Sequence, residues 1–148
     1  MAKLLLDTSV YILKIRGELA SEIEEELRRA LPLTFLSSVV AYELYRGASD
    51  RTGKRLIDHV VAPFERTGRV VTPTHANWRD AARTVTGLVR KEPALATKVP
   101  ALQNDTLIAL SSRQIGAMVW TNDADDFSLI RQQQPFRLRM IERRAERR

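Results

Sequence analysis

Short apolar runs alternate along the chain with longer stretches in which apolar residues recur every three or four positions. The short runs predict strands, because they are rich in apolar residues and too short for helices. These runs lie at residues 3–6, 33–36, 69–72, 117–121 and 136–141. The longer stretches have the period of an amphipathic helix. They lie at residues 10–14, 18–30, 38–46, 51–67, 74–91 and 105–114.

This alternation of strands and helices predicts an α/β fold. We expect a three-layer α/β/α sandwich around a central, mainly parallel sheet of five strands, because crossover connections of this length join parallel neighbours. Prolines and polar residues set the expected element ends. Pro63 predicts a kink or break in its helix, residues 94–101 a loop, and Asn104 or Asp105 the cap of the helix that follows.

The length of 148 residues predicts one domain, and the absence of cysteine excludes disulfide scaffolds, zinc ribbons and thiol nucleophiles. No apolar run is long enough to span a membrane, and the N-terminal run is too short for a signal peptide. We therefore expect a cytoplasmic protein with no membrane partner.

Positive charge is concentrated at the C-terminus. The net charge is +6, and residues 137–148 contribute six Arg and two Glu, or +4 of it. We predict a single domain over residues 1–141 and an Arg-rich tail over 142–148. Such a tail indicates either a polyanionic partner or a solubilising end.

Four acidic residues stand where a parallel α/β sheet places its ligands. Asp7 and Asp123 follow predicted strands, whose carboxyl ends form the binding edge of such sheets. Glu43 lies on the apolar face of its helix, and Asp105 lies at the predicted start of another. Taken singly, each has a structural alternative: Asp7 and Asp105 as helix caps, Asp123 as a turn residue, Glu43 as the ion-pair partner of Arg46.

Together, these acids would repel one another and raise one another's pKa values. A divalent cation removes that repulsion, and an all-oxygen donor set favours Mg²⁺, with Mn²⁺ as a substitute. Such a site suits phosphodiester hydrolysis by a metal-activated water.

The chain resembles the PIN-domain family, and within it the VapC-type ribonuclease toxins of toxin–antitoxin pairs. The resemblance runs from residue 3 to about 136 and rests on four segments in order. These segments are LLLDTSVYI with Asp7, LSSVVAYELYRGA with Glu43, NDTLIALSSR with Asp105 at a helix start, and VWTNDADDF with Asp123 and Asp126.

The resemblance implies a PIN-like fold and a four-acid Mg²⁺ site that cleaves RNA. The implied catalytic residues are Asp7, Glu43, Asp105 and Asp123. The same acids would bind the metal, and Asp126 is the alternative fourth acid. Thr8, Ser9, Thr121 and Asn122 are expected to orient these carboxylates or their waters. The implied partners are an RNA substrate, a small VapB-like antitoxin and a second copy of the chain.

Two other functions compete with this one. A catalytically silent PIN-like module could bind RNA or a protein, but clustered carboxylates do not favour binding to a polyanion. Phosphoryl transfer through an aspartyl intermediate is the third possibility. It is disfavoured because Ser9 stands where related phosphatases need a second acid.

The remaining candidate residues are given structural roles. His59 and His75 are single residues without metal-ligand spacing, and we expect them at the surface or in ion pairs. Trp78 and Trp120 are expected in the core rather than as platforms for bases. The three tyrosines could pack at the cleft or between subunits; they are Tyr11, Tyr42 and Tyr45.

Overall fold

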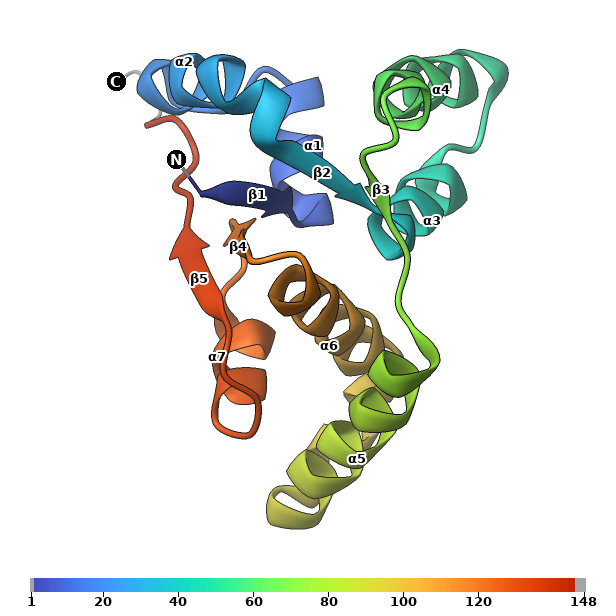
Figure 1. The fold of residues 1–148 in the computed structure, drawn as a ribbon, viewed down its shortest axis with the longest axis vertical. Helices are drawn as coiled ribbons and strands as arrows, with labels where there is room; N and C mark the ends of the chain where they lie inside the picture. Colours follow the sequence, from blue (N-terminus) through green and yellow to red (C-terminus); the bar gives the residue numbers. More distant parts are fainter. Residues whose placement is uncertain (1, 146–148) are drawn as a thin grey trace.

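The computed structural model describes residues 2–145, which form one parallel sheet with helices on both faces (Figure 1). The sheet has the strand order β3-β2-β1-β4-β5, and every neighbouring pair is parallel. Its strands are β1 (Lys3–Leu6), β2 (Thr34–Ser37), β3 (Val70–Val71), β4 (Ala117–Thr121) and β5 (Arg137–Met140). The α/β sandwich with a central parallel sheet predicted from the sequence is confirmed.

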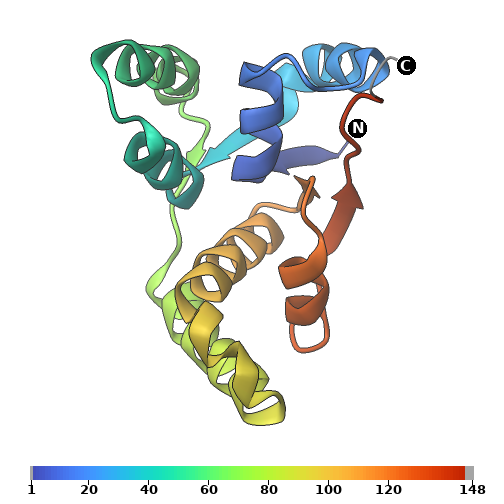
Figure 2. The ribbon, with the colours of Figure 1, turned by 180° about the vertical axis from the view of Figure 1, so that it is seen from behind.

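The helices divide between the two faces of the sheet according to the direction in which the chain crosses it. The α-helices are α1 (Thr8–Ile15), α2 (Ser21–Ala30), α3 (Ser38–Gly47), α4 (Arg51–Arg66), α5 (His75–Lys91), α6 (Val99–Gln114) and α7 (Asp125–Arg131). Figures 1 and 2 show α1, α2 and α4 on one side of the sheet and α5, α6 and α7 on the other. Chain order reverses between β1 and β4, which are neighbours at the centre.

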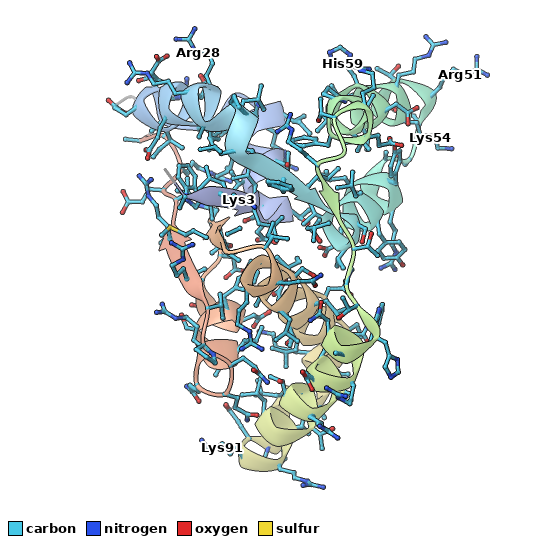
Figure 3. All side chains as sticks on the ribbon, viewed as in Figure 1. Lys3, Arg28, Arg51, Lys54, His59 and Lys91 are labelled. Carbon is cyan, nitrogen blue, oxygen red and sulfur yellow. The ribbon has the colours of Figure 1, made fainter. Side chains whose placement is uncertain are left out.

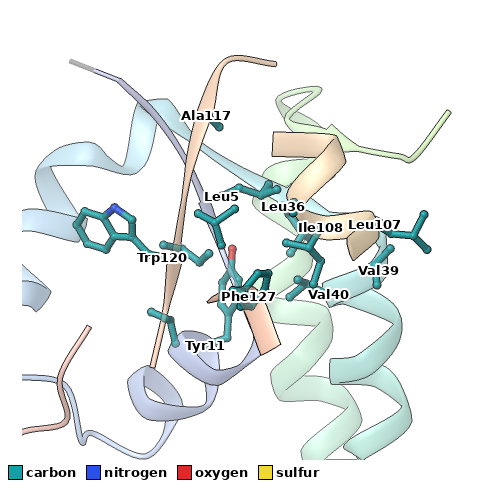
Figure 4. Close-up of a cluster of buried hydrophobic side chains, with 14 of the residues drawn as sticks. Leu5, Tyr11, Leu36, Val39, Val40, Leu107, Ile108, Ala117, Trp120 and Phe127 are labelled. Atoms are coloured by element: carbon teal, nitrogen blue, oxygen red, sulfur yellow. The ribbon is translucent and has the colours of Figure 1, made fainter. Parts of the chain in front are cut away.

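The core lies on both faces of the central strands. Leu5, Leu36 and Val119 are completely buried, and Figure 4 shows Leu5 and Leu36 close to Ile108 of α6. Residues 106–112 of α6 are all buried. The buried Ser111 hydroxyl donates to the backbone oxygen of Leu107 at 2.7 Å, so this helix satisfies its own polar groups inside the core.

Two helix boundaries differ from those predicted. α4 continues through Pro63 and ends at Arg66, because this proline stands in the last turn, where little helix remains to be disrupted.

The segment 94–101 is not a loop. A 3₁₀ helix covers Pro93–Lys98, and α6 starts at Val99 with Pro100 in its first turn, where no N–H is required. The prediction that Asp105 caps a helix is therefore wrong, since Asp105 lies inside α6.

The aromatic residues separate into buried and exposed groups. Trp120 is 2% exposed and lies in the core, as predicted, with the guanidinium of Arg139 4.4 Å from its ring centre. The prediction for Trp78 is wrong: this residue, in the first turn of α5, is 50% exposed. Tyr11 is buried, whereas Tyr42 and Tyr45 are exposed.

The surface carries the two histidines, and the start of the tail contacts the domain. His59 and His75 are exposed, as predicted, and Figure 3 shows His59 on the outer side of α4. Arg143 forms a 3.2 Å ion pair with Glu18, and the N–H of Arg144 donates to the Glu18 backbone oxygen. Tail residues 146–148 lie outside the described residues. Within residues 2–145, none of the helices combines the length and apolar character needed to cross a bilayer.

A candidate carboxylate site between β1 and β4

The candidate site lies at the carboxyl ends of the two central strands, where chain order reverses. This is the position at which parallel α/β sheets bind their ligands. Asp7 follows β1, and Asn122 and Asp123 follow β4. The backbone N–H of Asp7 donates to the Trp120 oxygen at 2.8 Å, so the hydrogen bonding of the sheet continues to the acid itself.

Asp7 is a buried acid held by two hydroxyl groups. Its Oδ2 accepts hydrogen bonds from Ser9 Oγ at 2.8 Å and from Thr121 Oγ1 at 2.9 Å. Burial raises the pKa of Asp7, and these hydroxyls, with the nearby N–H groups of Thr8 and Ser9, oppose the increase. The side chain of Asp7 makes no capping hydrogen bond to α1, so the interpretation of Asp7 as only a helix cap is not supported.

The same hydroxyls fix the loop after β4. The N–H of Asn122 donates to Ser9 Oγ at 2.9 Å, and the N–H of Asp123 donates to Thr121 Oγ1 at 3.0 Å. The amide of Asn122 donates to the Ile141 backbone oxygen at 2.8 Å, at the end of β5. Short polar side chains therefore join the ends of three strands around Asp7.

Glu43 reaches the site from α3. Its Oε1 accepts a 2.8 Å hydrogen bond from Thr8 Oγ1, which brings it to the first turn of α1. Burial raises the pKa of Glu43, and the negative charge of Asp7 adds to the increase, whereas hydrogen bonds from Thr8 and Asn104 oppose it. No salt bridge joins Glu43 to Arg46 in the described part of the chain, so the structural alternative for this residue is not supported either.

Asp105 is the acid whose environment is most unfavourable to charge. Burial raises its pKa to about 9, and the negative charges of Asp7, Glu43, Asp126 and Asp123 contribute to that increase, in this order. A half-buried carboxyl surrounded by like charges prefers to hold a proton at neutral pH. The fold thus brings the five acids named by the sequence into one electrostatic cluster.

Asp123 and Asp126 differ in their surroundings. Asp123 is exposed in the loop, whereas Asp126 is buried at the start of α7. Asp126 Oδ1 lies 2.6 Å from the ammonium nitrogen of Lys98, and the Asp126 carboxylate is the main cause of the raised pKa of Lys98. Sequence reasoning missed Lys98 because it assigned this segment to a loop. Recognising that α6 starts at Val99 would have placed Lys98 about two helical turns before Asp105.

The donor set of this cluster fits a hard divalent cation. All of its donors are carboxylate oxygens, which such a cation prefers. The Lys98 ammonium already occupies a cation's place beside one of these acids, Asp126. Among residues 2–145, however, no three acidic or histidine side chains meet at one point in the arrangement that a bound ion requires. Binding would therefore need side-chain rotations, and Asp126 could join the ligands only if it were released from Lys98.

Comparisons with known proteins show similarity in fold. No family model and no curated protein matches the chain. A chain of the DNA-bound VapBC from Salmonella typhimurium has a TM-score of 0.66 and 22% identity, over 95% of this chain and 98% of that one. A chain of FitAB bound to a DNA fragment has a TM-score of 0.68 and 18% identity, over 93% and 94%.

A third solved structure has the same architecture. A chain of VapBC-1 from nontypeable Haemophilus influenzae has a TM-score of 0.55 and 21% identity, over 93% of this chain and 96% of that one. These alignments cover nearly the whole length of both chains. The protein therefore has the PIN-like fold that the sequence resemblance implied.

Proposed function

We propose that this protein is a metal-dependent endoribonuclease that acts as the toxin of a toxin–antitoxin pair. The observation that carries the proposal is the cluster of acids at the carboxyl ends of β1 and β4, in which burial and four neighbouring acids raise the pKa of Asp105. Buried like charges of this kind destabilise a fold, and they are typical of functional sites. The similarity to chains of VapBC and FitAB structures supports the choice of toxin within the fold.

The carboxylates of Asp7, Glu43, Asp105 and Asp123 would bind Mg²⁺ or Mn²⁺, with Asp126 as the alternative fourth ligand. The bound metal would lower the pKa of a water molecule and neutralise charge on the scissile phosphate. The chain's own hydroxyls orient the ligands: Ser9 and Thr121 hold Asp7, and Thr8 holds Glu43. Hydrogen bonds of this kind fix the direction of each carboxylate before a cation arrives.

The competing functions explain the geometry less well. A silent binding module would gain nothing from buried, mutually repelling acids, since they weaken its contact with a polyanion. For an aspartyl phosphoryl transfer, the residue two positions after Asp7 would have to be an acid that serves the leaving group. Here it is Ser9, and its hydroxyl donates to Asp7 instead.

An exposed apolar surface between α1, α2 and α4 supports the proposal that the protein binds a protein partner such as an antitoxin. Ile15 and Leu31 are 38% and 46% exposed and line a cavity of about 330 Å³ between α1, α2 and α4. Large apolar side chains gathered around a cavity mark a protein interaction surface. We infer that a VapB-like antitoxin covers apolar surface of the toxin, and that the toxin forms a homodimer.

The experiment that tests the activity is cleavage of single-stranded RNA by purified protein with Mg²⁺ or Mn²⁺, and with EDTA. We expect Asp7→Asn, Glu43→Gln and Asp105→Asn each to remove most of the activity. Glu22→Gln is the matched control, because Glu22 is exposed on α2. Activity that persists in EDTA would refute the metal mechanism.

The same assay distinguishes the two candidates for the fourth acid. We expect Asp123→Asn to be inactive and Asp126→Asn to retain activity; the reverse result would exchange their roles. Growth arrest when the chain is expressed alone would support the toxin role. Normal growth with an active enzyme in the cell would contradict it.

A further inference from the structure

A groove beside the carboxylate site has the properties of a subsite for nucleic-acid bases. It lies where α3, the start of α5 and the start of α6 meet, and its volume is about 490 Å³. This volume is in the range of small-molecule sites. The residues of the groove that carry the argument are Tyr42, Arg46, Trp78, Gln103 and Asn104.

Two aromatic rings of the groove are unusually exposed. Trp78 is 50% exposed and Tyr42 is 57% exposed, although both belong to well-formed helices. In the described part of the chain, neither the indole N–H nor this phenol hydroxyl has a protein hydrogen-bond partner. Tyr45 is different, because its hydroxyl donates to Asp58 at 2.7 Å. The packing of the domain therefore does not explain why the side chains of Trp78 and Tyr42 are both exposed in one groove.

The charge of the groove is opposite in character to that of the adjoining site. None of its lining residues is acidic, and Arg46 is its cationic residue. In the described residues Arg46 forms no salt bridge, so its guanidinium is available to a phosphate. The side-chain amides of Gln103 and Asn104 offer both donors and acceptors to the edge of a base.

Asn104 joins the groove to the carboxylate site, because it lines the groove and its side chain also hydrogen-bonds to Glu43. A strand whose phosphate lies at the acids would therefore have its neighbouring nucleotides at the mouth of the groove. Unpaired bases are the groups that proteins stack on exposed aromatic rings when they bind single-stranded RNA.

We propose that Trp78 and Tyr42 stack the unpaired bases of a single-stranded RNA next to the cleavage site, with Arg46 on the adjacent phosphate. The proposal rests on the ribonuclease function proposed above and adds the residues that bind the nucleotides next to the scissile phosphate. A second copy of the chain is the competing occupant of the groove, and measurements of RNA affinity and of oligomeric state separate the two.

Binding is measured with a fluorescein-labelled single-stranded RNA of mixed sequence and Mn²⁺, in an Asp7→Asn background that prevents cleavage. We expect Trp78→Ala to raise Kd by about 5- to 150-fold, equivalent to about 1–3 kcal/mol for one stacked base. Trp78→Phe, which keeps a flat ring, should recover most of the affinity. Tyr45→Ala is the control aromatic variant outside the groove.

Tryptophan fluorescence gives a readout that a structural role for Trp78 would not produce. The chain has two tryptophans, and Trp120 is only 2% exposed. We expect RNA to quench the emission of the Asp7→Asn chain, and Trp78→Phe to abolish most of that quenching while the RNA still binds. Quenching that survives in Trp78→Phe would overturn the assignment.

Two further outcomes would overturn the proposal without touching the ribonuclease function. One is RNA cleavage by Trp78→Ala with unchanged KM, together with unchanged RNA affinity. The other is conversion of a dimer to a monomer by Trp78→Ala in analytical ultracentrifugation, with unchanged affinity per chain, which would assign the groove to a second copy. Absence of cleavage by the wild-type protein under all metal conditions would instead refute the proposed function itself.

Discussion

Asp105→Asn is expected to stabilise the metal-free protein, and to do so more strongly as pH rises. The substitution keeps the shape of the side chain and removes its charge. The pKa of Asp105 is about 9 in the folded state, against 3.8 for an unperturbed aspartate. Between these values the folded state holds one proton that the unfolded state has released. The free energy of unfolding therefore falls as pH rises through this window.

The size of the effect follows from that single proton. One proton corresponds to at most about 1.4 kcal/mol per pH unit, so the upper limit between pH 6 and pH 8 is about 2.7 kcal/mol. Neighbouring acids titrate together with Asp105 and share part of the change. We expect Asp105→Asn to flatten the pH dependence and to be about 1–2 kcal/mol more stable than wild type at pH 8 in EDTA.

The assay is urea unfolding in EDTA at pH 6, 7 and 8, with Glu22→Gln as a control that removes one exposed charge. A parallel series with Mn²⁺ measures the stability added by the ion, which should be smaller in Asp105→Asn because one ligand is removed. The reasoning would be refuted if Asp105→Asn were less stable than wild type in EDTA, with the same pH slope and the same increment from Mn²⁺. Asp105 would then be a structural residue.

Three further predictions concern the surroundings of the site. Lys98→Met should tighten Mn²⁺ binding by about fivefold, because a positive charge beside the acids is removed; unchanged or weaker binding in calorimetry would contradict this. Thr121→Val should cost about 1–2 kcal/mol in urea unfolding and weaken Mn²⁺ binding, because Asp7 loses a buried hydrogen bond; an unaltered response to Mn²⁺ would count against the positioning role. Deleting residues 143–148 should make RNA binding less salt-dependent, by about 0.7 in logarithmic slope for each phosphate that the tail no longer neutralises; an unchanged slope would leave the tail a solubilising end.

Three of the five strands were predictable because they are mainly buried on both faces. β1, β2 and β4 are continuous apolar runs, as parallel strands between two helix layers must be. The order of the strands follows from right-handed crossovers, and it places Asp7 and Asp123 at the same edge. For this reason the acids could be located together from the sequence, although their distances and hydrogen bonds could not.

The start of α6 could not be predicted from the pattern of apolar residues. This helix is buried over residues 106–112 and includes serines and a threonine, so it lacks the polar face that reveals a surface helix. Pro100 also suggested a break, although a proline in the first turn is compatible with a helix. The correct boundary changes the chemistry, because it moves Asp105 from a capping position to the interior of a helix.

The fourth acid shows what a motif can and cannot determine. Asp123 and Asp126 are three residues apart, so their spacing from the other acids gives no basis for choosing between them. The fold separates them: the backbone of Asp123 is tied to Thr121, which holds Asp7, whereas the carboxylate of Asp126 is already neutralised by Lys98. A cation that replaced the ammonium would have to break that ion pair, but it could recruit the exposed Asp123 without breaking one. We therefore propose Asp123 as the ligand, and the carboxylate of Asp126 as the partner that holds Lys98.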